Sequence, residues 1–264
     1  MDLLSLAQDA INTNPEWYPF FADPVVINQL VHINGELNEQ LNRGMEIYPS
    51  PELIFRAFAL TKVSTMQVIM LGQDPYPGEY SIRVVEPIVE TIGDKVIQHE
   101  KVKQKLCPYA TGLAFSVPPN APIPSSLQNI FRELAMTYHQ PHWSDHGDLT
   151  YWALQGVFLL NTALTVIRNQ KETHLSLWEG FIGLVIRWLA TQRPVLVYLA
   201  LGAKAKKKVT TTLSNPTMLT CSHPSGLSAS RGESPFLGSK IFAQCNCLLS
   251  NKGLPGIDWR LPLQ

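Results

Sequence analysis

Cysteine is scarce in this chain of 264 residues, which contains four. So few thiols cannot cross-link a chain of this size, and this favours a reducing environment. Two of them form a C-x-C pair on a segment with helical spacing, and we therefore expect buried free thiols rather than a metal or iron–sulfur cluster. The four are Cys107, Cys221, Cys245 and Cys247.

An excess of charge is also missing, since 21 Lys and Arg residues balance 21 Asp and Glu residues. Any nucleic-acid contact must therefore be a local patch. Long hydrophobic runs are missing too: the runs 181–190 and 194–203 are about half of the ~20 residues that span a membrane. The N-terminus shows neither an export signal nor a basic presequence. We expect an intracellular protein with no membrane contact, in the nucleus or the cytoplasm depending on its source.

Four short runs are apolar nearly throughout: Val68 to Leu71, Val157 to Leu160, Val195 to Leu201 and Met218 to Cys221. Runs of this kind are typical of strands buried on both faces of a parallel sheet. Helical patterns lie between them. The order predicts an α/β fold, a three-layer α/β/α arrangement with a central four-stranded, mainly parallel sheet. No repeat or linker interrupts it, so we expect one domain over residues 1–264.

Serine residues mark the expected starts of the helices. Ser176 with Glu179 has the spacing of a capping box, and Ser125 with Gln128 has the same spacing. Two Ser-Pro pairs, at 50–51 and 234–235, predict further helix starts because proline is favoured in the first turn.

In an open parallel sheet, ligands bind beyond the carboxyl ends of the strands. Asp74 and Tyr76 follow the first run, Asn161 the second and His223 the fourth. We expect these groups to meet in one crevice. A carboxylate can direct water, a carboxamide can bind the edge of a pyrimidine, and a donor can stabilise a departing base, so the set suits hydrolysis of an N-glycosidic bond. Phe115 is a candidate ring for stacking on a flipped base.

These segments resemble the family 1 uracil-DNA glycosylases. The family's water-activating motif is matched by Gly72 to Tyr76, its stacking segment by Gly112 to Val117 and its uracil-reading strand end by Leu159 to Asn161. Its wedge loop is matched by His223 to Leu227, and its C-terminal motif by Ile257 to Trp259. The likeness runs from about residue 48 to residue 261 in the family's order. It implies removal of uracil from DNA by hydrolysis, as the first step of base excision repair, without a metal or a cofactor.

The resemblance implies a role in catalysis or uracil binding for five residues. Asp74 would position the attacking water, and His223 would hydrogen-bond the uracil O2 as a neutral imidazole. Gln73 would contact uracil through its backbone, Phe115 would stack on the base and Asn161 would bind its edge. The base must first be flipped out of the stack.

The resemblance also implies how the base is selected and how DNA is held. Tyr76 would occupy the space of a 5-methyl group and so exclude thymine. Leu227 would enter the base stack, while Ser126, Pro224 and Ser225 would contact the DNA backbone. The implied partner is uracil-containing DNA, single- or double-stranded; a protein inhibitor or a replication protein is a further candidate. We expect a monomer.

Two departures from the family stand out. Pro77 stands where most members have a histidine that helps to hold the catalytic water. An insertion at about residues 79–111 separates the water-activating motif from the stacking segment. It is balanced in charge and rich in Val and Ile, so we expect it to fold locally against the body, at the rim of the active site. Its residues leave open whether it gates the pocket, grips DNA, receives a partner or is a passive elaboration.

The departures keep two alternatives open. One is a catalytically weak or inactive DNA-binding scaffold for replication, because a branch of the family that also has proline after the tyrosine serves in this way. Intact Asp74, Asn161 and His223 argue against it. The other is a glycosylase of broader base range, against which Tyr76 argues.

Overall fold

The structure is a computed structural model that describes residues 1–92 and 95–262, except for the side chains of residues 88–99. The α-helices are α1 (Leu3–Thr13), α2 (Tyr18–Phe21), α3 (Pro24–Asn42), α4 (Arg56–Leu60), α5 (Ser125–Thr137), α6 (Thr150–Leu154), α7 (Leu175–Gln192), α8 (Ala203–Thr212) and α9 (Ile241–Asn251). The strands are β1 (Ile47–Tyr48), β2 (Val68–Gly72), β3 (Glu79–Ile92), β4 (Lys95–Pro108), β5 (Val157–Asn161), β6 (Val166–Ile167), β7 (Val197–Leu201) and β8 (Met218–Cys221). Pro15–Trp17 and Pro51–Leu53 form short 3-10 turns.

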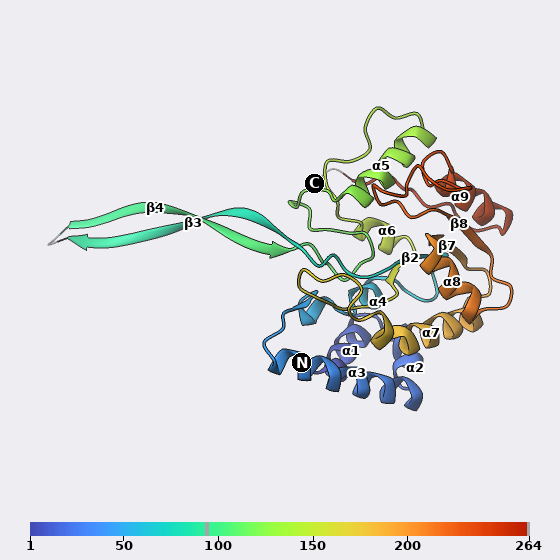
Figure 1. Ribbon diagram of the computed structural model, residues 1–264, viewed down its shortest axis with the longest axis horizontal. Coiled ribbons are helices and arrows are strands. Elements are labelled where there is room, and N and C mark those ends of the chain that lie inside the picture. Colours follow the sequence, from blue (N-terminus) through green and yellow to red (C-terminus); the bar gives the residue numbers. More distant parts are fainter. Residues whose placement is uncertain (93–94, 263–264) are drawn as a thin grey trace.

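The central sheet has the strand order β5-β2-β7-β8, and all of its pairings are parallel. Helices α1, α2, α3 and α7 cover one face, and α5, α6 and α9 cover the other (Figure 1). Strands β2, β5 and β7 are buried along their whole length, which explains why their sequences are apolar without alternation. The predicted α/β/α fold with a four-stranded sheet is therefore confirmed, and the sheet is parallel throughout.

Aromatic side chains fill the core on both faces of the sheet. On the side of α7, Trp17 packs against Phe58 and Phe158 with ring centroids 4.7 and 5.2 Å apart. On the other side, Trp259 lies edge-on to Trp152 at 5.2 Å. Fully burying an aromatic ring contributes about 1.5–3 kcal/mol. The two clusters hold the sheet, and with it the ends of the strands, in a fixed position.

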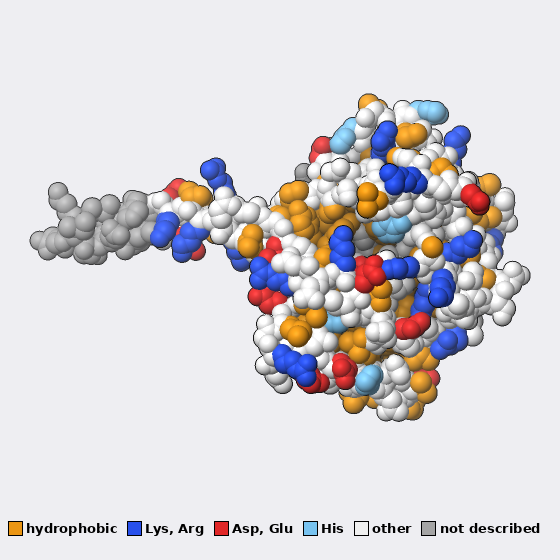
Figure 2. Space-filling model, in the orientation of Figure 1, with side chains coloured by type: hydrophobic (Ala, Val, Ile, Leu, Met, Phe, Trp, Pro, Cys, Tyr) orange, Lys and Arg blue, Asp and Glu red, His pale blue; other side chains and the backbone are white. Residues whose placement is uncertain are grey.

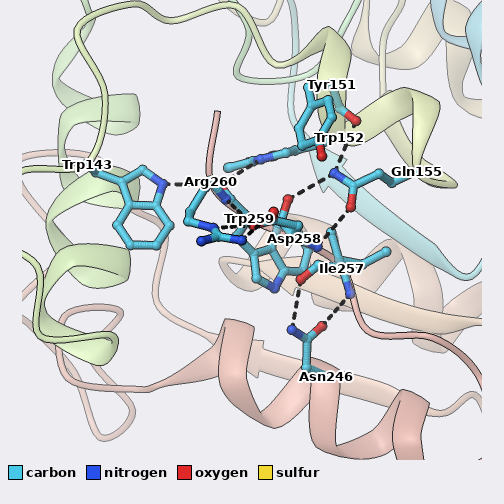
Figure 3. A network of polar contacts seen from close by, with 9 residues as sticks. All are labelled: Trp143, Tyr151, Trp152, Gln155, Asn246, Ile257, Asp258, Trp259 and Arg260. Carbon is cyan, nitrogen blue, oxygen red and sulfur yellow. Dashed lines mark hydrogen bonds and ion pairs between the residues drawn. The ribbon is translucent and has the colours of Figure 1, made fainter. Parts of the chain in front are cut away.

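The C-terminal segment is attached to the body by two side-chain amides (Figure 3). Gln155 donates to the carbonyl of Asp258 at 2.9 Å and accepts from its N–H at 2.8 Å. Asn246 makes the same pair of bonds with Ile257, at 2.9 Å each. Each amide satisfies a backbone donor and acceptor as a neighbouring strand would. The segment resembling the family's C-terminal motif thus has a structural position, with Trp259 in the core.

Several predicted helix starts are wrong. Helix α7 begins at Leu175 with His174 as its N-cap, so Ser176 lies inside the helix and forms no cap. The segment after Ser50 is a 3-10 turn, and α4 begins only at Arg56. Helix α9 begins at Ile241 rather than near residue 234. The start of α5 at Ser125 is confirmed, although Pro124 occupies the N-cap position.

The late start of α9 has a physical cause in a buried carboxylate of α5. Glu133 accepts hydrogen bonds from the backbone N–H groups of Gly238 and Lys240, at 2.5 and 2.6 Å. These donors are satisfied by a side chain and need no helical carbonyl. The segment that begins at the serine-proline pair is therefore a loop held by Glu133, and helix α9 begins after this loop.

The insertion is a long β-hairpin that extends away from the body (Figure 1). Strands β3 and β4 pair in register from Glu79 with Pro108 to Ile92 with Lys95. The expectation that this segment folds against the body is wrong: it folds locally, but its Val and Ile residues lie on strands that pair with each other. The pairing of β1 with β6 lies beside its base, as Ile47 opposite Ile167.

The thiols and the helices bear on two other expectations. The four cysteines are free thiols, and Cys221 and Cys245 are buried as expected. Cys247 is exposed, which corrects the expectation for that residue. In residues 1–92 and 95–262, no helix is both long and apolar enough to cross a membrane.

Candidate active site

A cavity of about 440 Å³ opens at the carboxyl ends of β2, β5 and β7. Eight of the ten predicted site residues line it: Gln73, Asp74, Tyr76, Phe115, Ser126, Asn161, His223 and Ser225. They come from segments that are far apart in the sequence. The parallel sheet brings them together because its strands all end at the same edge.

Asp74 lies two residues beyond the end of β2 and is partly buried. Its Oδ2 accepts a hydrogen bond from the backbone N–H of Glu172 at 2.7 Å, and its Oδ1 accepts one from Gln73 Nε2 at 3.3 Å. Burial raises the pKa of the Asp74 carboxyl, and these hydrogen bonds oppose that shift. The result is an oriented carboxylate that is more basic than an exposed aspartate.

Asn161 is the last residue of β5 and pairs in register with Gly72. It is 6% exposed, and its side chain lines the cavity. The next two residues fix the neighbouring loop, because the N–H of Ala163 and the hydroxyl of Thr162 both donate to the carbonyl of Gln73, at 3.0 and 2.7 Å. The end of β5 and the hydrogen bonds to the Gln73 carbonyl therefore hold the Asn161 carboxamide in place at one wall of the cavity.

Phe115 forms another wall and has an unusual backbone conformation. Its φ is +66°, a left-handed value that few residues other than glycine adopt. Its carbonyl accepts a hydrogen bond from Tyr76 Oη at 3.4 Å, and the N–H of the preceding Ala114 donates to Leu159 of β5. Backbone strain of this kind is found at functional sites, where surrounding contacts maintain it. Here it presents an aromatic ring to the cavity.

His223 faces Phe115, with ring centroids 6.0 Å apart. Its Nδ1 accepts a hydrogen bond from the backbone N–H of Ser225 at 3.0 Å. Since Nδ1 accepts, the proton of the neutral ring is on Nε2. Burial lowers the pKa of His223, and the nearby charge of Lys171 lowers it further. The structure thus provides a neutral imidazole with one N–H donor available to a ligand.

Gly202 allows His223 to come this close. Its φ is +100°, and a Cβ at this position would lie 3.0 Å from the Cβ of His223. Any other residue would be strained and would press on the imidazole. Gly202, which follows β7, therefore belongs to the site because it has no side chain that would press on His223.

The predicted wedge loop exposes one large apolar side chain. Leu227 is 79% exposed, at the position expected for a residue that enters DNA. Pro224 is buried, and its carbonyl accepts a hydrogen bond from Asn129 of α5 at 2.8 Å. Ser228 donates to the carbonyl of His223 at 2.9 Å and shares a hydrogen bond with Ser225 at 2.7 Å. The loop is held internally, and of the ten predicted residues only Pro224 and Leu227 do not line the cavity.

Sequence reasoning missed the loop after β6. Lys171 and Glu172 line the cavity, and Glu172 forms an ion pair with Lys204 at the start of α8. That bond lowers the pKa of Glu172. The contact of this loop with Asp74 is made by a backbone N–H, which has no residue signature, so no motif could have revealed it.

Comparisons with known proteins agree with this geometry. The family model described as "Uracil DNA glycosylase superfamily" matches residues 60–250. A uracil-DNA glycosylase of Pectobacterium atrosepticum is 37% identical over 256 residues, which cover 95% of this chain and 98% of the relative. The crystal structure of the mimivirus uracil-DNA glycosylase superposes with a TM-score of 0.76 at 30% identity, and covers 94% of this chain and 87% of that chain. A mimivirus variant in complex with UGI gives a TM-score of 0.77 at 30% identity, with 94% and 89% covered.

A parallel α/β/α fold whose strand ends hold a carboxylate, a carboxamide and an imidazole around one cavity defines an α/β protein equipped for hydrolysis. The family match and the identity over nearly the whole chain define it further. The chain belongs to the uracil-DNA glycosylase superfamily, as its motifs predicted.

Proposed function

We propose that this protein hydrolyses the N-glycosidic bond of uracil in DNA, releasing free uracil and leaving an abasic site as the first step of base excision repair. The protein is a DNA glycosylase of the hydrolase class. One observation carries the assignment: Asp74, Asn161 and His223 line the same cavity as Phe115. A cavity of about 440 Å³ is ample for one pyrimidine base.

Recognition of the base rests on three walls. The carboxamide of Asn161 supplies a donor and an acceptor for the edge of uracil. The ring of Phe115 stacks on the flipped base, with the backbone of Gln73 at its rim. Tyr76 fills the space that a 5-methyl group would need, and its bond to the carbonyl of Phe115 keeps its ring in place.

The reaction separates charge, and each charge has a partner. The bond between C1′ and N1 breaks, and its electron pair leaves with uracil as an anion. The N–H at Nε2 of His223 stabilises this anion at O2, and the carboxylate of Asp74 faces the positive sugar. A water directed by Asp74 then bonds to C1′ and gives its proton to the Asp74 carboxylate, and solvent protonates the departing uracil. Asp74 is oriented for this role by Glu172.

DNA is held around the cavity by the loop that carries Leu227. This side chain enters the space that the flipped nucleotide has left, while Ser126 and Ser225 contact the DNA backbone. Pro224 is buried and supports the loop through the bond of its carbonyl to Asn129. Single- and double-stranded DNA both suit such a site, since the wedge needs no partner strand. We infer that the protein acts as a monomer, in the nucleus or the cytoplasm. A protein inhibitor that mimics DNA is a candidate partner, because a similar mimivirus protein was solved in complex with UGI.

The test is release of uracil from labelled single-stranded and duplex oligonucleotides, with thymine-containing controls. Asp74→Asn should reduce turnover by orders of magnitude and change DNA binding little, because the amide keeps the size of the side chain but cannot accept a proton. Uracil release that persists in this variant would remove Asp74 from the mechanism. Absence of release by the unmodified protein, with DNA binding retained, would overturn the assignment in favour of a DNA-binding scaffold.

A further inference from the structure

The base of the β3–β4 hairpin is firmly attached to the body. The carboxylate of Glu79 accepts from Tyr48 Oη at 2.6 Å and pairs with Arg168 at 2.5 Å. Tyr80 is buried, and its hydroxyl donates to Asn120 Oδ1 at 2.9 Å. The direction in which the hairpin leaves the body is therefore fixed by side chains of its first two residues.

One face of the hairpin is continuous with the mouth of the cavity. The ring of Tyr80 packs on that of Tyr109 at 5.1 Å, and Tyr109 lies 6.2 Å from Tyr76, which lines the cavity. Residues two apart on a strand share a face, so the face of Tyr80 also carries the even-numbered residues of β3. We call it the inner face; it includes Tyr80, Ile82, Val84 and Glu86 with their partners on β4.

Three of the four partners on β4 are lysines, and the fourth is Cys107 opposite Tyr80. Lys105 pairs with Ile82, Lys103 with Val84 and Lys101 with Glu86. All three are exposed, and Figure 2 shows basic side chains on the described part of the hairpin. Lys103 forms an ion pair with Glu86 at 2.5 Å. Over residues 79–87 and 100–108, the inner face thus bears three positive charges against one negative charge.

The opposite face of the same segment differs. There Val85 pairs with Val102, and Leu106 lies opposite Ser81. Its charged residues in the described ranges are Arg83 and Glu100, which balance, apart from Glu79 at the anchored base. The excess of positive charge is therefore confined to the inner face, which begins with Tyr80 at the base of the hairpin.

We propose that the inner face of the hairpin, through Lys101, Lys103 and Lys105, binds the phosphate backbone of DNA that flanks the uracil. This inference rests on the proposed function, which brings DNA to the cavity. The lysines lie three to seven residues from the end of β4 at Pro108, or roughly 10–23 Å along an extended strand. That distance corresponds to roughly 3–7 base pairs of duplex. The row of lysines carries the positive charge that phosphates require.

The experiment compares long and short DNA. The variant Lys101→Gln/Lys103→Gln/Lys105→Gln is tested for binding to a uracil-free duplex of about 30 base pairs, by fluorescence anisotropy between 50 and 200 mM salt. Loss of two to three phosphate contacts should weaken binding about tenfold at low salt and make the dependence of log Kd on log salt shallower by about 2. Excision from a short single-stranded oligonucleotide, with two nucleotides on either side of the uracil, should not change.

The matched control removes lysines from the other end of the sheet. Lys62 and Lys252 are exposed; Lys62 precedes β2, and Lys252 hydrogen-bonds Thr217, which precedes β8. Lys62→Gln/Lys252→Gln should leave the salt dependence unaltered. Glu86→Gln, which removes the acidic group of the inner face, should instead tighten binding to the long duplex.

Each result decides one question. Equal Kd and salt dependence in the triple variant and the unmodified protein would overturn the proposal, and so would an equal loss in the control. A change of oligomeric state with DNA affinity unchanged would assign the hairpin to a protein partner instead. If the triple variant loses activity on the short oligonucleotide, it has misfolded, and the result for Glu86→Gln decides. Failure of the unmodified protein to release uracil would count against the proposed function and leave the binding comparison intact.

Discussion

The side-chain oxygen of Asn161 occupies the space beside Gly72 that any other residue would fill. A Cβ built at Gly72 would lie 2.2 Å from Asn161 Oδ1 and 2.9 Å from the Cβ of Ala114. Real Cβ atoms do not come so close to a neighbour, so one of the groups would have to move. The carboxamide at the end of β5 can face the cavity only because β2 ends in glycine.

Gly72→Ala should therefore impair uracil excision through Asn161. We expect a loss of at least tenfold in kcat/KM, and a loss of about 1–3 kcal/mol in the free energy of unfolding from overpacking. Excision assays and chemical denaturation measure the two effects. Gly35→Ala is the control, because Gly35 lies in α3 with nothing within 4 Å of an added Cβ. It should keep full activity and gain slightly in stability. Unchanged activity of Gly72→Ala would mean that the Asn161 carboxamide can bind uracil from a different position.

Substitutions of Tyr76 should separate the size of the ring from its hydroxyl. Tyr76→Ala should release thymine as well as uracil, because it opens the space for the 5-methyl group. Tyr76→Phe should still exclude thymine, since it keeps the ring and loses only the hydrogen bond to Phe115 at 3.4 Å. Release of each base from matched oligonucleotides measures this. Thymine release by Tyr76→Phe, or none by Tyr76→Ala, would contradict the steric account.

The pH dependence of kcat should follow the opposite pKa shifts of two groups. Burial raises the pKa of Asp74, so its carboxylate becomes protonated at a higher pH than that of an ordinary aspartate. As the pH is lowered, turnover should therefore begin to fall earlier than it would with an ordinary aspartate. Burial lowers the pKa of His223 from 6.5, so the imidazole stays neutral below that pH and should cause no loss of activity there. A pH–rate profile of the unmodified protein and of His223→Gln distinguishes the two. A loss near pH 6.5 that disappears in His223→Gln would show that the imidazole titrates normally.

Glu133 should matter for stability more than for chemistry. It is fully buried, does not line the cavity and holds the backbone of Gly238 and Lys240. Glu133→Ala removes the hydrogen bonds of two partly buried N–H groups, and each of these bonds contributes about 0.5–1.5 kcal/mol. We expect Tm to fall by several degrees, measured by calorimetry, with kcat close to normal. Arg132→Ala, at the exposed neighbouring position, should leave Tm within about a degree. Equal Tm values for the two variants would show that the loop is held otherwise.

Much of the fold and of the site could be predicted because buried strands, and the polar residues that follow them, have characteristic residue types. The four apolar runs identify the sheet, and the polar residues that follow them identify the cavity. Asp74, Asn161 and His223 meet there because parallel strands share one carboxyl edge.

What could not be predicted depends on contacts between distant segments. Ser176 has the spacing of a capping box, yet the helix begins before it. The loop before α9 is set by Glu133, more than a hundred residues earlier in the chain. Val and Ile usually mark buried surface, so the composition of residues 79–111 predicts a segment packed against the body. Their role in pairing β3 with β4 depends on a register that composition does not reveal.

The strand order has a further consequence, for folding kinetics. Strand β2 is made before β5 and β7 but lies between them, so its neighbours are about ninety and about one hundred and thirty residues further along the chain. Pairings of such sequence separation form slowly, since long loops must close first. Asp74, Asn161 and His223 come together only after these distant pairings have formed. A ligand of the cavity should therefore slow global unfolding of the sheet, and amide exchange in β2 should report it most sensitively.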